Sequence, residues 1–107
     1  MKSYRLYYVD NANRMECMLT CSLNRSIDWC ENGLKIVTWK YNMVGHGQAE
    51  SLNAVFRHYS VLSIDKRKKR QMRTVNIGDI IVFDEEPWIV SAFGFIRVPD
   101  ILAKKIL

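Results

Sequence analysis

The clearest periodic pattern along the chain is helical. Leu52, Val55, Phe56 and Tyr59 recur at the i, i+3, i+4 and i+7 spacing that places apolar side chains on one stripe of an α-helix. The residues between them are mostly polar. The pattern therefore predicts a short amphipathic helix over residues 52–59, with its apolar stripe packed on the rest of the molecule.

Runs of β-branched and aromatic residues predict strands. One strand is predicted at Tyr4–Val9, and a hairpin is predicted at Ile80–Phe83 and Trp88–Ala92, with Asp84–Pro87 as its turn. Ile96–Val98 is expected to extend the same sheet. The strands therefore predict an antiparallel sheet that contains a carboxy-terminal β-hairpin.

The remaining segments carry less regular patterns. Leu34–Tyr41 alternates in a way that predicts a strand covered on both faces, and Gly45-His46-Gly47 is expected to break the chain after it. From Asn13 to Cys21 the apolar spacing favours a helix, although Met and Cys residues fit strands as well. Pro99 and Asp100 are typical of a helix start, so a final helix is predicted through Leu107.

These elements together predict the fold class. A chain of 107 residues has room for one hydrophobic core, so residues 1–107 are expected to form a single α+β domain. In this domain an antiparallel sheet is packed by one or two short helices.

The distribution of charge adds a candidate binding element. Sixteen Lys and Arg residues and eleven Asp and Glu residues give a net charge of +5. Five of the sixteen stand together between residues 66 and 70, so the rest of the chain is neutral. One basic tract on a neutral body is typical of an interaction element or of a solvated connector. The candidate contact residues are Lys66, Arg67, Lys68, Lys69, Arg70 and Arg73.

Two kinds of partner fit these charges. Each Lys or Arg that contacts a nucleic-acid phosphate releases a counterion and adds a salt-dependent term to the affinity. An acidic patch on a protein would satisfy the same side chains. The sequence leaves both partners open.

A second candidate surface lies in the predicted hairpin turn. Three adjacent carboxylates, Asp84, Glu85 and Glu86, are expected either to be hydrated, to bind a basic partner or to hold the neighbouring basic run in place. Trp88, which follows Pro87 at the predicted hairpin tip, is expected to be an exposed anchor for a protein partner or for a symmetric dimer.

Catalytic and metal chemistry find little support in the sequence. His46 and His58 have no flanking nucleophile motif, and no phosphate-binding glycine loop is present. Cys17 and Cys21 are the only closely spaced pair of thiols, and the third cysteine, Cys30, makes the number odd. We therefore expect buried free thiols, no metal, no cofactor and no enzymatic activity. No apolar run is long enough for a membrane span, and no signal peptide is recognised, so a cytoplasmic protein is expected.

Two glycine motifs have a structural interpretation. Gly78 is expected to permit a positive φ in a tight turn, where Asp79 accepts hydrogen bonds from nearby backbone amides. Phe93, Gly94 and Phe95 are expected to pack in the core around a bend. A Gly-Asp turn that opens a strand is also found in RNA-binding modules of the PUA and ASCH type, which supply an alternative function.

The carboxy-terminal half resembles the YodL-like family. The resemblance rests on the segment Met72–Val82, which contains Gly78-Asp79, and on Ser91–Pro99, which contains Phe93-Gly94-Phe95; with the helix at Leu52–Phe56 it spans about residues 50–102. It implies a non-enzymatic phage or mobile-element protein that binds and modulates a host macromolecule. Counter-defence, as an inhibitor of a host defence nuclease or complex, is one such role. The alternative is an RNA- or DNA-binding module that uses the basic loop.

Overall fold

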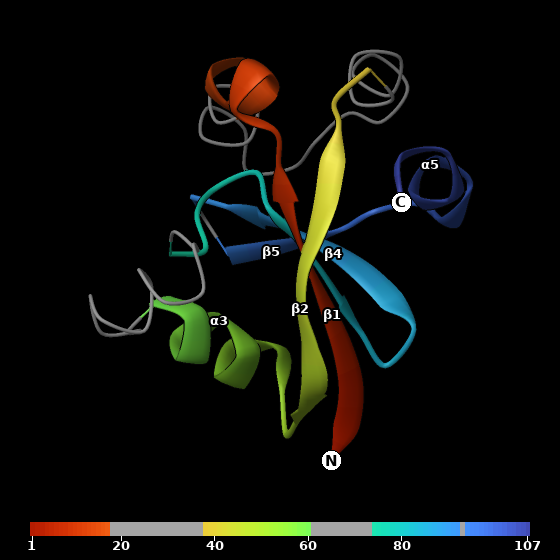
Figure 1. Ribbon diagram of the computed structural model, residues 1–107. Helices are drawn as coiled ribbons and strands as arrows, with labels where there is room; N and C mark the ends of the chain where they lie inside the picture. The colour runs from red at the N-terminus through yellow and green to blue at the C-terminus, as the bar shows by residue number, and fades with distance from the viewer. Residues whose placement is uncertain (18–37, 61–73, 93) are drawn as a thin grey trace.

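The computed structural model describes residues 1–17, 38–60, 74–92 and 94–107 (Figure 1). These residues form a five-stranded antiparallel sheet with the strand order β2-β1-β3-β4-β5, together with three short helices. The α+β fold class predicted from the sequence is therefore confirmed. In chain order the elements are β1 (Lys2–Val9), η1 (Asn11–Asn13), β2 (Tyr41–Ala49), α3 (Leu52–Ser60), β3 (Ile80–Phe83), β4 (Glu86–Ser91), β5 (Gly94–Arg97) and α5 (Asp100–Ile106).

The strand β1 lies inside the sheet, because it pairs with both β2 and β3. Leu6 stands opposite Gly45 of β2 and Ile81 of β3. Successive side chains of a strand point to opposite faces. Leu6 and Tyr8 accordingly join one hydrophobic core, while Val9 joins the other.

The helix α3 covers one face of the sheet. Val55 and Tyr59 are buried there, and Leu52 and Phe56 pack against them, so the predicted amphipathic helix is confirmed. Burial of a large aliphatic or aromatic side chain contributes about 1.5–3 kcal/mol, which explains why so short a helix is stable in this position. The buried residues of this α3 core are Leu6, Tyr8, Val55, Tyr59, Val75, Ile81 and Val90.

The helix α5 covers the opposite face. It begins at Asp100, directly after Pro99, as the sequence predicted, and Ile106 in its last turn is buried. Figure 1 shows α3 and α5 on different sides of the strands. The buried residues of this α5 core are Val9, Cys17, Trp39, Ile80, Val82, Ile89, Val98 and Ile106. No helix formed by the described residues is long and apolar enough to cross a membrane.

The prediction for the segment before α3 was wrong in part. The triplet Gly45-His46-Gly47 does not break the chain but lies inside β2. Of the strand predicted over Leu34–Tyr41, residues 34–37 lie outside the described residues, and the strand begins only at Tyr41. Trp39 lies in a bend, and its side chain is buried in the α5 core. An apolar residue at this position is therefore explained without a strand. Of the helix favoured over residues 13–21, Asn13 ends η1, residues 14–17 are α-helical, and residues 18–21 lie outside the described residues.

The hairpin β3–β4 is closed by two residues rather than by the four that the sequence suggested. Asp84 and Glu85 form the turn, with φ values of 50° and 65°. Glu86 and Pro87 already belong to β4, opposite Phe83 and Val82. Two consecutive residues with positive φ identify the type I′ geometry that follows the twist of a two-residue hairpin. Side chains other than glycine occupy both positions at a cost in backbone energy.

This turn yields a prediction about stability. Glu85→Gly is expected to raise the free energy of unfolding by about 0.5–1 kcal/mol, because the relief of the positive φ exceeds the additional entropy that glycine loses on folding. Urea unfolding followed by circular dichroism measures the change. Glu85→Ala is the matched control, since it removes the same carboxylate without relaxing the backbone, and it should not stabilise. Equal effects of the two substitutions would contradict the explanation.

Candidate functional site

The basic residues proposed as the recognition element lie outside the described residues. Lys66, Arg67, Lys68, Lys69, Arg70 and Arg73 all fall between residues 61 and 73. The chain on either side of this stretch is well anchored, because Tyr59 at one end and Val75 at the other are both buried in the α3 core. The described residues that flank this stretch thus both belong to the α3 core, and residues 66–73 are called the basic segment below.

The described residues carry no net charge. They contain eight Lys and Arg residues and eight Asp and Glu residues. The whole net charge of +5 resides between residues 61 and 73, where six basic residues accompany Asp65. The described residues, called the scaffold below, are thus electrically neutral, and the net positive charge of the chain belongs to the stretch that contains the basic segment.

The acidic turn is balanced by cations from other strands. Asp84 Oδ2 lies 3.7 Å from Lys2 Nζ, and Glu85 Oε1 lies 3.7 Å from Arg5 Nη1, so both carboxylates are paired with β1. These pairs are long and solvent-exposed, so each contributes less than about 1 kcal/mol. A basic partner that bound this turn would have to compete with the cations already present.

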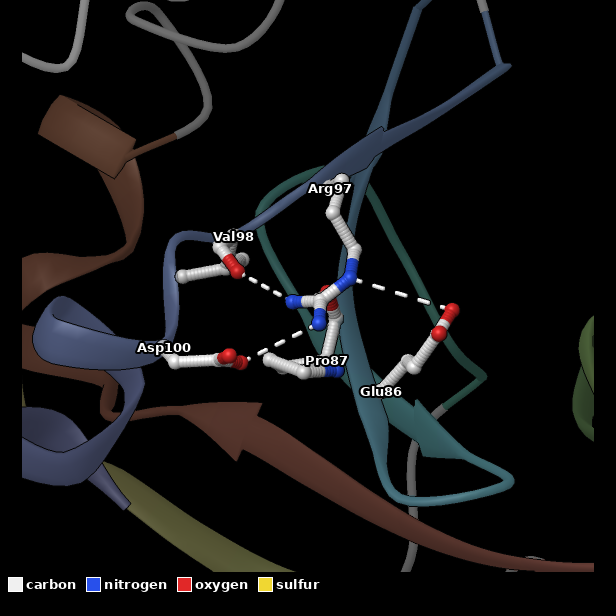
Figure 2. Close-up of polar contacts among 5 residues, drawn as sticks. All are labelled: Glu86, Pro87, Arg97, Val98 and Asp100. Carbon is white, nitrogen blue, oxygen red and sulfur yellow. Dashed lines mark hydrogen bonds and ion pairs between the residues drawn. The ribbon is translucent and has the colours of Figure 1, made fainter.

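Glu86 is paired with Arg97, which also binds three other groups (Figure 2). Arg97 Nε lies 3.8 Å from Glu86 Oε2, and Arg97 Nη2 donates to Asp100 Oδ1 at 3.1 Å. Arg97 Nη1 donates to the carbonyls of Pro87 and Val98. The guanidinium thus ties the beginning of β4 to the end of β5 and the first turn of α5. Its donors serve the scaffold rather than an external ligand.

The predicted placement of Trp88 at the hairpin tip was wrong. Trp88 lies inside β4, opposite Ile81 and Arg97, and its side chain is half-buried. Pro87, which was expected to lead out of the turn, is buried. The alternation of side chains along β4 places Trp88 on the same face as Val90, which belongs to the α3 core. A part of its ring remains accessible on that face, and its role as a partner anchor stays a prediction.

Gly78 and Asp79 form a hydrogen-bonded junction inside the scaffold. Gly78 has a φ of 96°, and its amide donates to the carbonyl of Val90 at 2.8 Å. The fully buried Asp79 carboxylate accepts hydrogen bonds from the amides of Val9, at 3.0 Å, and Asn76, at 2.8 Å. Both carboxylate oxygens are therefore engaged by backbone groups, and the motif joins the turn to β1 and β4. The structure gives it the conformation and the hydrogen bonds expected from the sequence.

The aromatic motif at the end of the sheet is only partly described. Phe93 lies outside the described residues. Gly94, with a φ of 122°, begins β5, and Ser91 Oγ donates to its carbonyl at 2.9 Å. Phe95 packs against the α3 core, where its ring meets Phe56 edge to face at a centroid distance of 5.8 Å. Phe95 therefore has the core position that the sequence suggested.

The thiol and imidazole groups occupy separate places. Cys17 is buried, and its Sγ donates to the carbonyl of Gly78 at 3.4 Å, whereas Cys21 and Cys30 are among the residues not described. His46 is exposed on β2 and His58 is exposed on α3. Within the four described ranges, no three His, Cys, Asp or Glu side chains come together as metal ligands.

The cations that balance the acidic turn are Lys2, Arg5 and Arg97, and none of them was predicted from the sequence. Lys2 and Arg5 reach it only because β1 pairs with β3, a contact between residues about eighty positions apart. For Arg97 a local signal existed, because Asp100 follows it at i+3 on the other side of Pro99. That spacing brings the two side chains together where the strand turns into α5.

Comparisons with known proteins add no relative from which a function could be transferred. No family model, no curated protein and no solved structure matches the chain. The charges of the chain and the contacts of its described residues are therefore the basis for a function.

Proposed function

We propose that this chain is a small non-enzymatic binding protein that modulates a host macromolecule through its basic segment. The observation that carries the proposal is the concentration of the whole net charge of +5 between residues 61 and 73, beside described residues that are neutral. At physiological ionic strength such a cluster acts over a Debye length of about 8 Å. Its complement is an anionic surface, and the attraction both favours the complex and speeds the encounter.

The proposed biological setting follows from the resemblance of about residues 50–102 to the YodL-like family. Family members of this kind occur in phages and mobile elements, so we propose a cytoplasmic target such as a host defence nuclease or the complex in which it works. The basic segment lies inside the region of resemblance.

Crosslinking in lysate of the native host tests this function. An amine-reactive crosslinker acts at lysines, and the chain offers Lys66, Lys68 and Lys69 in the basic segment, with Lys2, Lys104 and Lys105 as internal controls elsewhere. We expect one host protein to be joined repeatedly to the segment lysines, with and without nuclease treatment. Crosslinks distributed equally over both groups of lysines, or absent from the segment, would refute the proposal.

Direct binding to nucleic acid is the second candidate, and the spacing of the charges favours it. Six cations stand within eight residues. Along the duplex axis, each strand of DNA carries one phosphate charge per about 3.4 Å. The dense cationic charge of residues 66–73 complements this dense anionic charge.

The salt dependence of binding distinguishes the two candidates. A nucleic-acid binder should shift a labelled oligonucleotide of mixed sequence at low salt, and log K should fall against log salt with a slope of about −4 to −5 for six phosphate contacts. Replacing Lys66, Arg67, Lys68, Lys69, Arg70 and Arg73 with Gln should bring the slope close to zero. The control variant Lys104→Gln/Lys105→Gln should leave it unchanged. Fluorescence anisotropy at several salt concentrations gives both slopes, and a wild-type protein that binds no oligonucleotide at low salt removes this candidate.

A further inference from the structure

A pocket lies on the face of the sheet opposite α3. It is an open hollow with a volume of about 420 Å³, bordered by β1, the β3–β4 hairpin and α5. Its apolar lining comes from Tyr7, Val82, Pro87, Ala103 and Leu107. Pockets that hold small molecules have volumes of about 300–1,000 Å³ and combine an apolar wall with a few polar groups. This pocket is at the small end of that range and suits a body the size of one aromatic ring.

Four charged side chains complete the lining, and they differ in whether a group of opposite charge lies within ion-pair distance. They are Arg5, Glu85, Asp100 and Lys104. Asp100 is already bound by Arg97 at 3.1 Å, so its charge is compensated from outside the lining. Glu85 lies 3.7 Å from Arg5, and its side chain is 74% exposed. For Lys104, the residues that the structure describes provide no carboxylate within ion-pair distance. The four side chains carry no net charge, but Lys104 is the one among them whose charge no carboxylate of the described residues balances at ion-pair distance.

The two cations of the lining have different chemical abilities. A guanidinium offers parallel N–H donors that match the two oxygens of a carboxylate, whereas an ammonium acts as a point charge. Arg5 projects from β1 and Lys104 from α5, so an anion in the pocket would be met by both elements. A long, exposed pair such as Arg5–Glu85 contributes little, so an incoming carboxylate can replace Glu85 at small cost.

We infer that this pocket is a binding site for a small organic carboxylate with an apolar body. Arg5 and Lys104 hold the carboxylate, and the apolar lining, with Tyr7 and Leu107, takes the body of the ligand. The site lies on the face of the sheet opposite α3 and includes no residue of the basic segment, so it is a function additional to the one proposed above.

Titration of the full chain with three matched probes tests the charge preference. Benzoate, benzyl alcohol and benzylamine share one ring and differ in charge. In two-dimensional NMR of the isotopically labelled protein, benzoate should shift the amides of Arg5, Val82, Ala103 and Lys104 in a saturable way. Benzyl alcohol should bind at least several-fold more weakly, and benzylamine more weakly still. Shifts confined to other residues, no shifts at all, or equal binding of benzylamine would overturn the inference.

Substitution of the two cations tests the assignment of residues. Lys104→Gln and Arg5→Gln should each weaken benzoate binding by about tenfold, because each removes a charge-assisted hydrogen bond to the carboxylate. Lys105→Gln is the matched control, since Lys105 is the next residue of α5, is exposed and does not line the pocket. Equal weakening by Lys105→Gln would overturn the assignment.

Two further variants keep the test decisive. Lys104→Arg preserves the charge and should retain most of the binding. If Lys104→Gln weakened binding only by disturbing the structure, retention of the charge would not be expected to restore it. If Arg5→Gln unfolds the protein, as judged by circular dichroism, the Lys104 variants decide alone. The variant with six Gln residues in the basic segment should bind benzoate as the wild type does, so failure of this inference and failure of the proposed function can be distinguished.

Discussion

Replacement of Asp79 by Ala is expected to lower the free energy of unfolding by about 3–5 kcal/mol, since it strands two backbone amides that each cost about 1–3 kcal/mol when buried without an acceptor. These are the amides of Val9 and Asn76, which donate to the two carboxylate oxygens of this fully buried side chain. A domain of this size has a total stability of about 5–15 kcal/mol, so the variant should be close to unfolding at room temperature. Urea titration followed by circular dichroism measures the loss.

Two related substitutions show whether the hydrogen bonds are responsible. Asp79→Asn retains one acceptor oxygen but turns an NH2 group towards the other amide, so its effect should fall between those of the wild type and of Asp79→Ala. Asp84→Ala removes an exposed carboxylate from the hairpin turn, at a positive φ that Ala tolerates less well than Asp, and should lower the stability by no more than about 1 kcal/mol. If Asp79→Ala were no more damaging than Asp84→Ala, the junction described here would have no energetic importance.

Gly78→Ala is expected to cost about 2–5 kcal/mol, the sum of a strained backbone and a collision in the core. The φ of 96° at Gly78 is a conformation that residues with a side chain rarely adopt, and an added Cβ would lie 2.5 Å from Cys17 Sγ. Thermal and urea unfolding should both show the loss.

The two components can be separated experimentally. Gly94→Ala meets a comparable φ of 122° but has no heavy atom within 4 Å of the added Cβ, so it should show the backbone cost alone, about 1–2 kcal/mol. In the double variant Cys17→Ala/Gly78→Ala the collision is removed, and the loss should be smaller than the sum of the two single losses. Strict additivity would mean that the contact with Cys17 contributes nothing.

Local patterns predicted the elements whose formation depends on local chemistry. The helix α3 follows from the spacing of Leu52, Val55, Phe56 and Tyr59, which all contact the α3 core. The strands β1, β3 and β4 follow from runs of β-branched and aromatic residues. In each of these elements one short stretch of sequence contains both the residues that favour the helix or strand and the apolar residues that form its buried face.

Gly45, inside β2, explains why that strand was not predicted. An added Cβ at Gly45 would lie 2.5 Å from Tyr59 Oη, so the absence of a side chain serves a close approach rather than a turn. Tyr59 is in α3, and the contact exists only after helix and sheet have come together. A glycine in a strand has the same appearance in the sequence as a glycine in a loop, and only the packed neighbour distinguishes them.

The candidate surfaces were predictable in charge but not in pairing. The excess of cations at residues 66–73 is visible in the sequence, as are the three carboxylates of the hairpin turn. That Lys2, Arg5 and Arg97 stand beside those carboxylates depends on the order and register of the strands. The pocket between β1 and α5 likewise brings together side chains from the two ends of the chain, Arg5 and Lys104.

The neutrality of the scaffold has a consequence for the behaviour of the protein in solution. Exchange of the six segment cations for Gln would change the net charge from +5 to −1, so a chain with a pI near 9.3 would approach its isoelectric point at neutral pH. Proteins with almost no net charge lose the mutual repulsion that keeps their copies dispersed. Residues 66–73 thus carry the net charge by which copies of the molecule repel one another, and any anionic partner that neutralised them would remove this repulsion unless it contributed surplus charge of its own.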